Sequence, residues 1–188
     1  TQDQLSAVKR LCKQHNIDTE RFVPKKLQYF IAGCKEDGKR PGDVLVAEHD
    51  TDTRKKLELY QLYEEQCQRE GVVDFGELML RSYELLRDHD AIRTHYQRRF
   101  AHILVDEFQD TNKLQYAWLK QLAGDAVEGR FEARGSVIAV GDDDQSIYAF
   151  RGARVGNMAD FVREFDVQRQ IKLEQNYRSY SHILDTAN

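Results

Sequence analysis

The chain has 188 residues, of which 40% are hydrophobic and 32% are charged, a composition typical of one or two folded domains rather than of a disordered chain. Its formal net charge is −4, so any nucleic-acid surface must be a local patch or a stacking platform, not a global cationic field. No apolar run approaches the length of a membrane span, and the N-terminus lacks a signal-peptide pattern. We therefore expect a protein without a membrane segment.

Three scattered cysteines, Cys12, Cys34 and Cys67, form no ligand pair and leave an odd thiol. This usage favours a reduced, cytoplasmic setting. The chain opens without Met and ends shortly after an expected helix start at Ser181. We therefore expect it to be a piece of a longer protein.

The first hundred residues show apolar residues at helical spacing and no alternating strand pattern. Pro24 suits a first helical position, residues 51–53 offer an N-cap, and Gly71 suits a helix end. Asp74 with Glu77 resembles a capping box. The apolar stripes of four expected helices begin at Leu5, Leu27, Leu57 and Phe75, and a fifth, short helix covers 91–99.

Two stretches in this half imitate known motifs. Residues 33–40 are one residue short of a phosphate-binding loop, G-x-x-x-x-G-K-[ST], but Arg40 stands where a hydroxyl should hold Mg²⁺ and Glu36 would repel phosphate. Residues 74–76 spell the Asp-Phe-Gly of kinases, yet no glycine-rich loop or catalytic-loop motif accompanies them. Both stretches are better interpreted as helix ends.

The second half alternates apolar runs typical of buried strands with helical patterns. This order predicts an α/β fold whose parallel strands are joined by right-handed crossovers. The expected strands cover 103–105, 136–140 and 170–173. One expected helix is capped by Thr111 or Asn112, a second covers 158–165, and a surface loop covers 125–135.

Two carboxylates, Asp106 and Glu107, follow the strand at 103–105 directly. In an open α/β sheet the ligand crevice lies beyond the carboxyl ends of the strands. The first acid can hold a hydrated Mg²⁺, and the second can orient and deprotonate an attacking water. This arrangement suits nucleotide hydrolysis, whereas two solvated acids at a strand end are the simpler alternative for the pair alone.

The other two expected strand ends also carry polar motifs. Gln145 follows the strand at 136–140, and its amide could sense a terminal phosphate. Arg178 follows the strand at 170–173 and suits phosphate oxygens, while the neighbouring Tyr177 offers a flat face to a nucleobase. Taken alone, Gln145 is better interpreted as making a loop hydrogen bond, and Arg178 as making a surface ion pair.

Tyr148, Phe150 and Arg151 form a separate cluster in a polar, glycine-bounded loop. Aromatic rings stack on single-stranded bases with little sequence preference. Packing of both rings beneath the loop is the alternative, and the residues alone leave the two readings open.

Taken together, these motifs resemble the UvrD/PcrA/Rep family of superfamily 1 DNA helicases. Val-Asp-Glu-Phe-Gln-Asp-Thr-Asn at 105–112 resembles helicase motif II, residues 140–153 resemble motif III, and Leu-Glu-Gln-Asn-Tyr-Arg-Ser at 173–179 resembles motif IV. Residues 73–81 are similar to part of the helical subdomain that these enzymes carry. The resemblance covers nearly the whole chain.

The resemblance implies a division into an all-helical subdomain at 1–99, part of a first RecA-like motor domain with its parallel sheet and flanking helices at 100–175, and the start of a second at 176–188. It also implies ATP and Mg²⁺ as cofactors, and single-stranded and partly duplex DNA as the partner, with repair or replication proteins as further partners. By position, the implied roles are Mg²⁺ binding for Asp106, water activation for Glu107, γ-phosphate contact for Gln145 and Arg178, adenine stacking for Tyr177, and DNA contact for Tyr148, Phe150 and Arg151.

The implied parent is an ATP-driven translocase that unwinds duplex DNA with 3′ to 5′ polarity. Because this sequence contains no true phosphate-binding loop and none of the later helicase motifs, we expect the 188 residues alone to be inactive. One alternative is a nucleic-acid-binding or partner-docking module that never hydrolyses ATP. Another is a metal-dependent nuclease using Asp106, Glu107 and the aspartates at 142–144, since two-metal sites need converging acids.

Overall fold

The computed structural model describes residues 2–127, 130–142 and 156–175, together with residues 177, 180 and 186. Its helices are α1 (Gln2–Gln14), α2 (Pro24–Glu36), α3 (Thr51–Glu70), α4 (Phe75–Asp88), α5 (Asp90–Arg99), α6 (Lys113–Ala123) and α7 (Asn157–Glu164). Its strands are β1 (His102–Val105), β2 (Gly124–Val127), β3 (Arg130–Ala133) and β4 (Ser136–Ala139), with short 3₁₀ turns η1 (Pro41–Asp43) and η2 (Phe108–Asp110).

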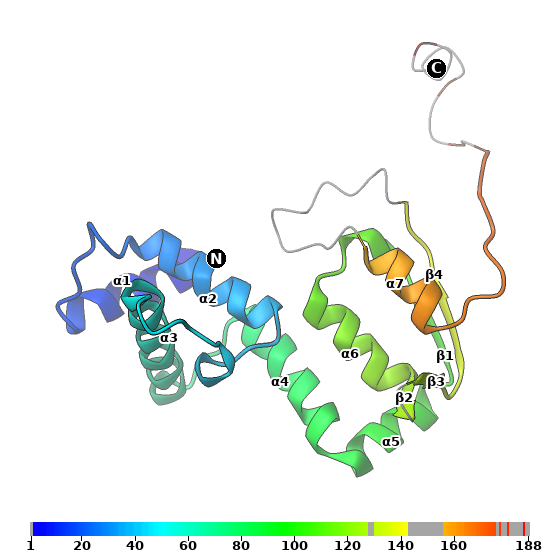
Figure 1. The fold of residues 1–188 in the computed structure, drawn as a ribbon, viewed down its shortest axis with the longest axis horizontal. Coiled ribbons are helices and arrows are strands. Elements are labelled where there is room, and N and C mark those ends of the chain that lie inside the picture. The colour runs from blue at the N-terminus through cyan, green and yellow to red at the C-terminus, as the bar shows by residue number, and fades with distance from the viewer. Residues whose placement is uncertain are drawn as a thin grey trace.

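Helices α1, α2 and α3 pack together at the N-terminal end of the molecule (Figure 1). Their shared core is fully buried and includes Leu11, Ile31, Leu59 and Tyr60. Pro24 begins α2 as predicted, since its missing N–H costs nothing in a first helical turn. The predicted all-helical character of this region is therefore confirmed.

The ends of α3 show both a small error and a success of the sequence analysis. Asp50, just before the predicted cap at 51–53, caps α3 by accepting the Thr53 backbone N–H at 2.9 Å. Gly71 ends the helix in the left-handed conformation that glycine adopts without strain.

Helix α4 leads from the three-helix core to the sheet region (Figure 1). It packs against α2 and against α6, and Trp118 on α6 donates its indole N–H to Ser82 Oγ at 2.9 Å. The expected division between two subdomains after residue 99 stays a prediction. Helices α4 and α5, which precede that position, pack against α6, which follows it.

The apolar side expected for α4 is partly wrong. Phe75 and Leu78 are 78% and 54% exposed, whereas Leu80 and Leu86 are buried. The reason is that the first turn of α4 directs Glu77 inward, toward the basic side chains of Lys35 and Arg40. Its apolar neighbours therefore face outward.

β1 and β4 form a parallel pair in which Ile103 lies opposite Val137 and Val105 lies opposite Ala139. These four side chains pack against a buried cluster of Phe108, Tyr116, Leu119 and Phe161 that α6, α7 and η2 provide. The α/β class with a parallel sheet is thus confirmed.

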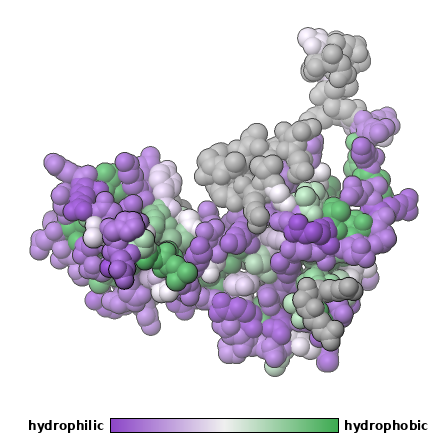
Figure 2. Space-filling model, in the orientation of Figure 1, coloured by the Kyte–Doolittle hydropathy of each residue, from purple (hydrophilic) through white to green (hydrophobic). Residues whose placement is uncertain are grey.

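The opposite face of this sheet does not fit the expected full burial. Leu104 and Ile138 are 70% and 59% exposed, and Figure 2 shows hydrophobic surface beside the sheet and α7. Among the described residues, helices cover only one face of the two strands. Apolar side chains on the other face consequently meet solvent.

Two further expectations about the second half are wrong. The predicted loop at 125–135 contains an antiparallel hairpin, in which Gly124 lies opposite Ala133. Strands of only four residues show little periodicity, so sequence analysis missed them. Residues 170–173 form no strand, and Ile171 is 69% exposed, because a strand needs a neighbour to satisfy its backbone and this segment has none among the described residues.

Of the helices in the described part of the chain, none has both the length and the apolar character needed to span a membrane.

Candidate active site

The acid pair lies where β1 ends. Glu107 has φ 50° and ψ 43°, a left-handed conformation uncommon outside glycine and often found at functional sites. Its backbone N–H donates to Asp106 Oδ1 at 2.9 Å. Both residues are exposed, so their carboxylates are accessible to solvent and to a ligand.

Beyond the last paired residues, β1 and β4 stay joined. Val140 donates its backbone N–H to the Val105 carbonyl at 2.8 Å, and Phe108 donates to the Val140 carbonyl at 2.9 Å. The acid pair therefore lies beside Gly141 and Asp142, at the carboxyl ends of two neighbouring parallel strands. This is the edge at which open α/β sheets bind ligands.

Sequence analysis missed Gln109, the residue that links these two strand ends. Its Nε2 donates to Glu107 Oε2 at 2.7 Å, and its Oε1 accepts the Asp142 backbone N–H at 3.1 Å. Its side chain is buried although it is polar. The available signal was its position within the motif at 105–112, two residues after the acid that it contacts.

A second set of contacts fixes the turn behind the acids. Thr111 Oγ1 donates to the Phe108 carbonyl at 2.7 Å, and Asn157 Nδ2 donates to the Thr111 carbonyl at 2.8 Å. Asn112 caps α6 through a reciprocal bond with Gln115, as the sequence indicated. Because the turn is held from α6 and α7, the acid pair stands on a rigid base.

The metal-binding role expected for Asp106 fits the chemistry of the residues present. An exposed carboxylate suits Mg²⁺, which keeps several waters and takes one or two carboxylates together with phosphate oxygens. Within the described ranges, no three His, Cys, Asp or Glu side chains gather into a group that could hold a metal. A bound Mg²⁺ would therefore depend on Asp106, water and substrate oxygens.

The structure gives no mutual placement for the remaining predicted site residues. Gln145, Tyr148, Phe150, Arg151 and Arg178 lie outside the described residues. Tyr177 is described and is 86% exposed, so its ring is available for stacking. Among the predicted site residues, the structure therefore shows how Asp106 and Glu107 lie relative to each other.

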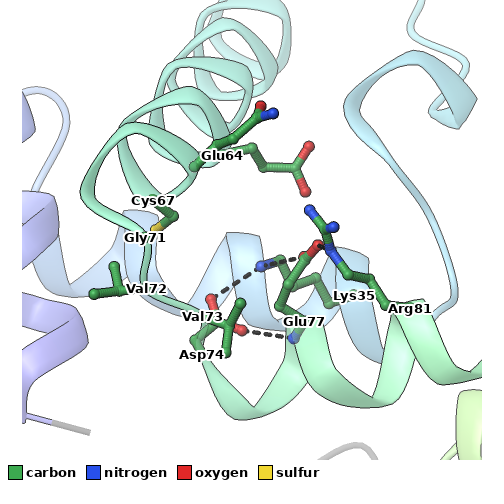
Figure 3. A pocket seen from close by; sticks show the side chains of 10 residues that line it. Lys35, Glu64, Cys67, Gly71, Val72, Val73, Asp74, Glu77 and Arg81 are labelled. Carbon is green, nitrogen blue, oxygen red and sulfur yellow. Dashed lines mark hydrogen bonds and ion pairs between the residues drawn. The ribbon is translucent and has the colours of Figure 1, made fainter.

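A second polar cluster lies at the junction of α2, α3 and α4, around a cavity of about 160 Å³ (Figure 3). Lys35 Nζ lies 2.9 Å from Asp74 Oδ2 and 2.9 Å from Glu77 Oε2. Arg40 pairs with Glu77. The other pairs of this cluster join Arg40 to Glu64 and Glu84, and Arg81 to Glu77.

The charges of this cluster compensate one another. Burial by itself would raise the pKa of the Glu77 carboxyl, but hydrogen bonds from Arg40, Arg81 and Lys35 hold that pKa at about 2. The hydrogen bond with Glu84 raises the pKa of the Arg40 guanidinium above its usual range. Apart from the Arg81–Glu77 pair within α4, the pairs join separate segments of the helical region, so we interpret the cluster as an anchor for the first turns of α4.

Comparison with known proteins matches this chain to DNA helicases. The family model described as UvrD/REP helicase N-terminal domain matches residues 1–166. DNA helicase II of Haemophilus influenzae is 47% identical over 188 residues, which are 100% of this chain and 24% of that protein.

Two further relatives show similar coverage. DNA helicase II of Escherichia coli is 46% identical over 189 aligned positions, an alignment that covers 100% of this chain and 25% of that protein. ATP-dependent DNA helicase PcrA of Staphylococcus epidermidis is 37% identical over 186 residues, 99% of this chain and 24% of that protein. The chain thus spans about a quarter of the length of these relatives.

Proposed function

Because the chain belongs to the UvrD/REP helicase N-terminal domain family, we propose that it forms part of an ATP-dependent DNA helicase. In this proposal the longer protein couples hydrolysis of Mg-ATP to movement on single-stranded DNA and to unwinding of the duplex. The observation that supports it most directly is the exposed acid pair, Asp106 and Glu107, at the carboxyl end of β1 and beside the end of β4.

Each acid has its own role in the proposed reaction. Asp106 would hold Mg²⁺, and the ion would supply positive charge to offset that of the phosphates. Glu107 accepts a hydrogen bond from the attacking water, aligns it with the γ-phosphate, and takes its proton at a carboxylate oxygen. The left-handed turn at Glu107 and the bond from Gln109 keep that carboxylate at the strand end.

Further contacts to the nucleotide are proposed from motif positions. Gln145 contacts the γ-phosphate, Arg178 neutralises charge that develops there during transfer, and Tyr177 stacks on adenine. The exposure of Tyr177 is consistent with this role. These residues belong to different parts of the chain, so they complete one pocket as the motor domains close.

The DNA track is proposed to include Tyr148 and Phe150 as stacking platforms, with Arg151 near the phosphate backbone. We further propose the RecA-like division into 1–99, 100–175 and 176–188, and movement with 3′ to 5′ polarity. The parallel pair of β1 and β4 with α6 and α7 on one face is consistent with this architecture.

Replacement of the proposed base in the longer protein tests this function. Glu107→Gln removes the proton acceptor but keeps the side-chain size, and general bases contribute about 10²–10⁴-fold to a rate. We expect kcat for DNA-stimulated ATP hydrolysis to fall by that order while DNA affinity is retained. Glu48→Gln, at an exposed acid outside the site, is the matched control and should keep the wild-type rate.

Two results would contradict the proposal. A near-normal rate in Glu107→Gln would remove the site assignment. A longer protein that binds DNA but never hydrolyses ATP would instead support a binding or docking module, and metal-dependent cutting of DNA would support a nuclease.

A further inference from the structure

We infer that Gln109 is a positioning residue that holds the Glu107 carboxylate and ties it to the first residues after β4. This inference rests on the proposed role of Glu107 as the base. The inference assigns to Gln109 the control of where the Glu107 carboxylate points. It also connects that carboxylate to the segment after β4.

Both ends of the Gln109 amide are occupied in a way that fits this role. A glutamine amide has donor hydrogens on nitrogen and an acceptor oxygen. Here Nε2 donates to Glu107 Oε2 at 2.7 Å, while Oε1 accepts the Asp142 N–H at 3.1 Å. One planar group therefore spans from the acid after β1 to the backbone after β4.

The surroundings restrict where this amide can lie. Gln109 is only 3% exposed, so its own amide is largely shielded from solvent. A Cβ added at Gly141 would lie 2.6 Å from Gln109 Oε1 and 3.1 Å from Met158 Cε. Position 141 thus leaves room for the amide because it has no side chain, and any larger residue there would push the amide away.

A physical consequence follows for the base. Because the amide is rigid and bonded at both ends, a displacement of Gly141 and Asp142 moves Nε2 and with it the preferred position of the Glu107 carboxylate. A misplacement of about 1 Å in a catalytic group can cost about 10²-fold in rate. The arrangement therefore makes the alignment of the base depend on the position of the chain after β4.

The first test removes the two hydrogen bonds from the longer protein with little change in size. In Gln109→Met we expect kcat for ATP hydrolysis to fall by about 10- to 100-fold. KM for ATP should stay within about threefold of wild type, because the role inferred for Gln109 is to hold Glu107 and not to bind the nucleotide. The matched control is Gln97→Met, at a buried glutamine on α5 that donates to the carbonyls of Gln121 and Gly124. It should lower stability and leave kcat within about twofold.

The second test asks whether Gln109 acts through Glu107. In a Glu107→Gln background, Gln109→Met should cause no further loss of the single-turnover rate, since the carboxylate that it positions is gone. A loss of the same size in both backgrounds would show a merely structural role and would overturn the inference.

A third variant keeps the inference testable if Gln109→Met does not fold. Gly141→Ala keeps Gln109 in the sequence, but its added Cβ displaces the amide of that side chain. This variant should also lower kcat, and only when Glu107 is present. The inference would be overturned if Glu107→Gln loses activity but kcat is normal in Gly141→Ala and in any folded Gln109 variant. Normal turnover in Glu107→Gln itself would instead refute the proposed function.

Discussion

The backbone N–H of Phe108 donates to the carbonyl of Val140 at 2.9 Å. This bond continues the pairing of β1 and β4 past the last residues of both strands. It places the acid pair and the chain after β4 side by side, with the buried ring of Phe108 beneath them. The geometry of the candidate site therefore starts from the sheet itself and not from a mobile loop.

The 188-residue chain by itself should show no DNA-stimulated ATP turnover. It carries the acid pair, but it contains no G-x-x-x-x-G-K-[ST] sequence to hold the phosphates. The measurement is phosphate release by the purified chain with Mg-ATP, with and without single-stranded DNA. Turnover that disappears in Glu107→Gln would contradict the prediction.

Asp106→Asn should raise the Mg²⁺ concentration needed for half-maximal ATP turnover by the longer protein. The amide keeps the side-chain shape but loses the charge that favours the cation, and each 1.4 kcal/mol of lost binding corresponds to about tenfold in affinity. Turnover measured against Mg²⁺ concentration, with a chelator as the zero point, gives the shift. Asp3→Asn, on the exposed first turn of α1, should leave it unchanged, and an unchanged requirement in Asp106→Asn would remove the metal assignment.

Much of the element order was predictable, because local signals determine it. Pro24, Gly71, Asp74 and the apolar run before Asp106 each act within one helix turn or one strand. The ion cluster was not predictable, since Lys35 and Asp74 are 39 positions apart and Arg40 and Glu84 are 44 apart. No local pattern shows that such side chains meet.

The same distinction explains the candidate site. The acids could be found because they directly follow a strand, while the role of Gln109 depends on the pairing of β1 with β4, which brings Asp142 within its reach. The hairpin of β2 and β3 was missed because each strand has only four residues, and the packing of Phe131 on Phe165 joins distant parts of the chain. The convergence of Gln145 and Arg178 on the acids stays a prediction.

The stability of the chain should fall steeply between about pH 4.5 and pH 2. The pKa of Glu77 is lowered from 4.5 to about 2 in the folded protein, so the unfolded chain binds the proton first as the pH falls. The stabilisation is complete above the unfolded value, is lost through this window, and amounts to about 3 kcal/mol. Denaturant unfolding at several pH values measures it.

Glu77→Gln supplies the comparison for this pH dependence. The variant should be less stable at neutral pH and should have a flatter pH profile below 4.5, because the group that takes up the proton is absent. Glu48→Gln, at an exposed acid, should follow the wild type. An equally steep acid limb in Glu77→Gln would show that another carboxylate is responsible.

Two glycines should respond oppositely to alanine. At Gly124 a Cβ would lie 2.0 Å from the Glu132 carbonyl oxygen, whereas at Gly33, inside α2, nothing lies within 4 Å. Gly124→Ala should destabilise the chain by about 1–3 kcal/mol through overpacking, and Gly33→Ala should stabilise it by about 0.5–1 kcal/mol. Thermal or denaturant unfolding of both variants measures the difference, and equal effects would contradict the close pairing of β2 with β3.

The most direct measurement is a crystal structure of the longer protein with Mg²⁺ and a non-hydrolysable ATP analogue. The account predicts Asp106 at the metal, directly or through one of its waters, and a water between Glu107 and the γ-phosphate at about 2.6–3.2 Å from the carboxylate. Gln145 and Arg178 should reach the same phosphate. A nucleotide bound elsewhere, with the end of β1 facing away from it, would contradict the account.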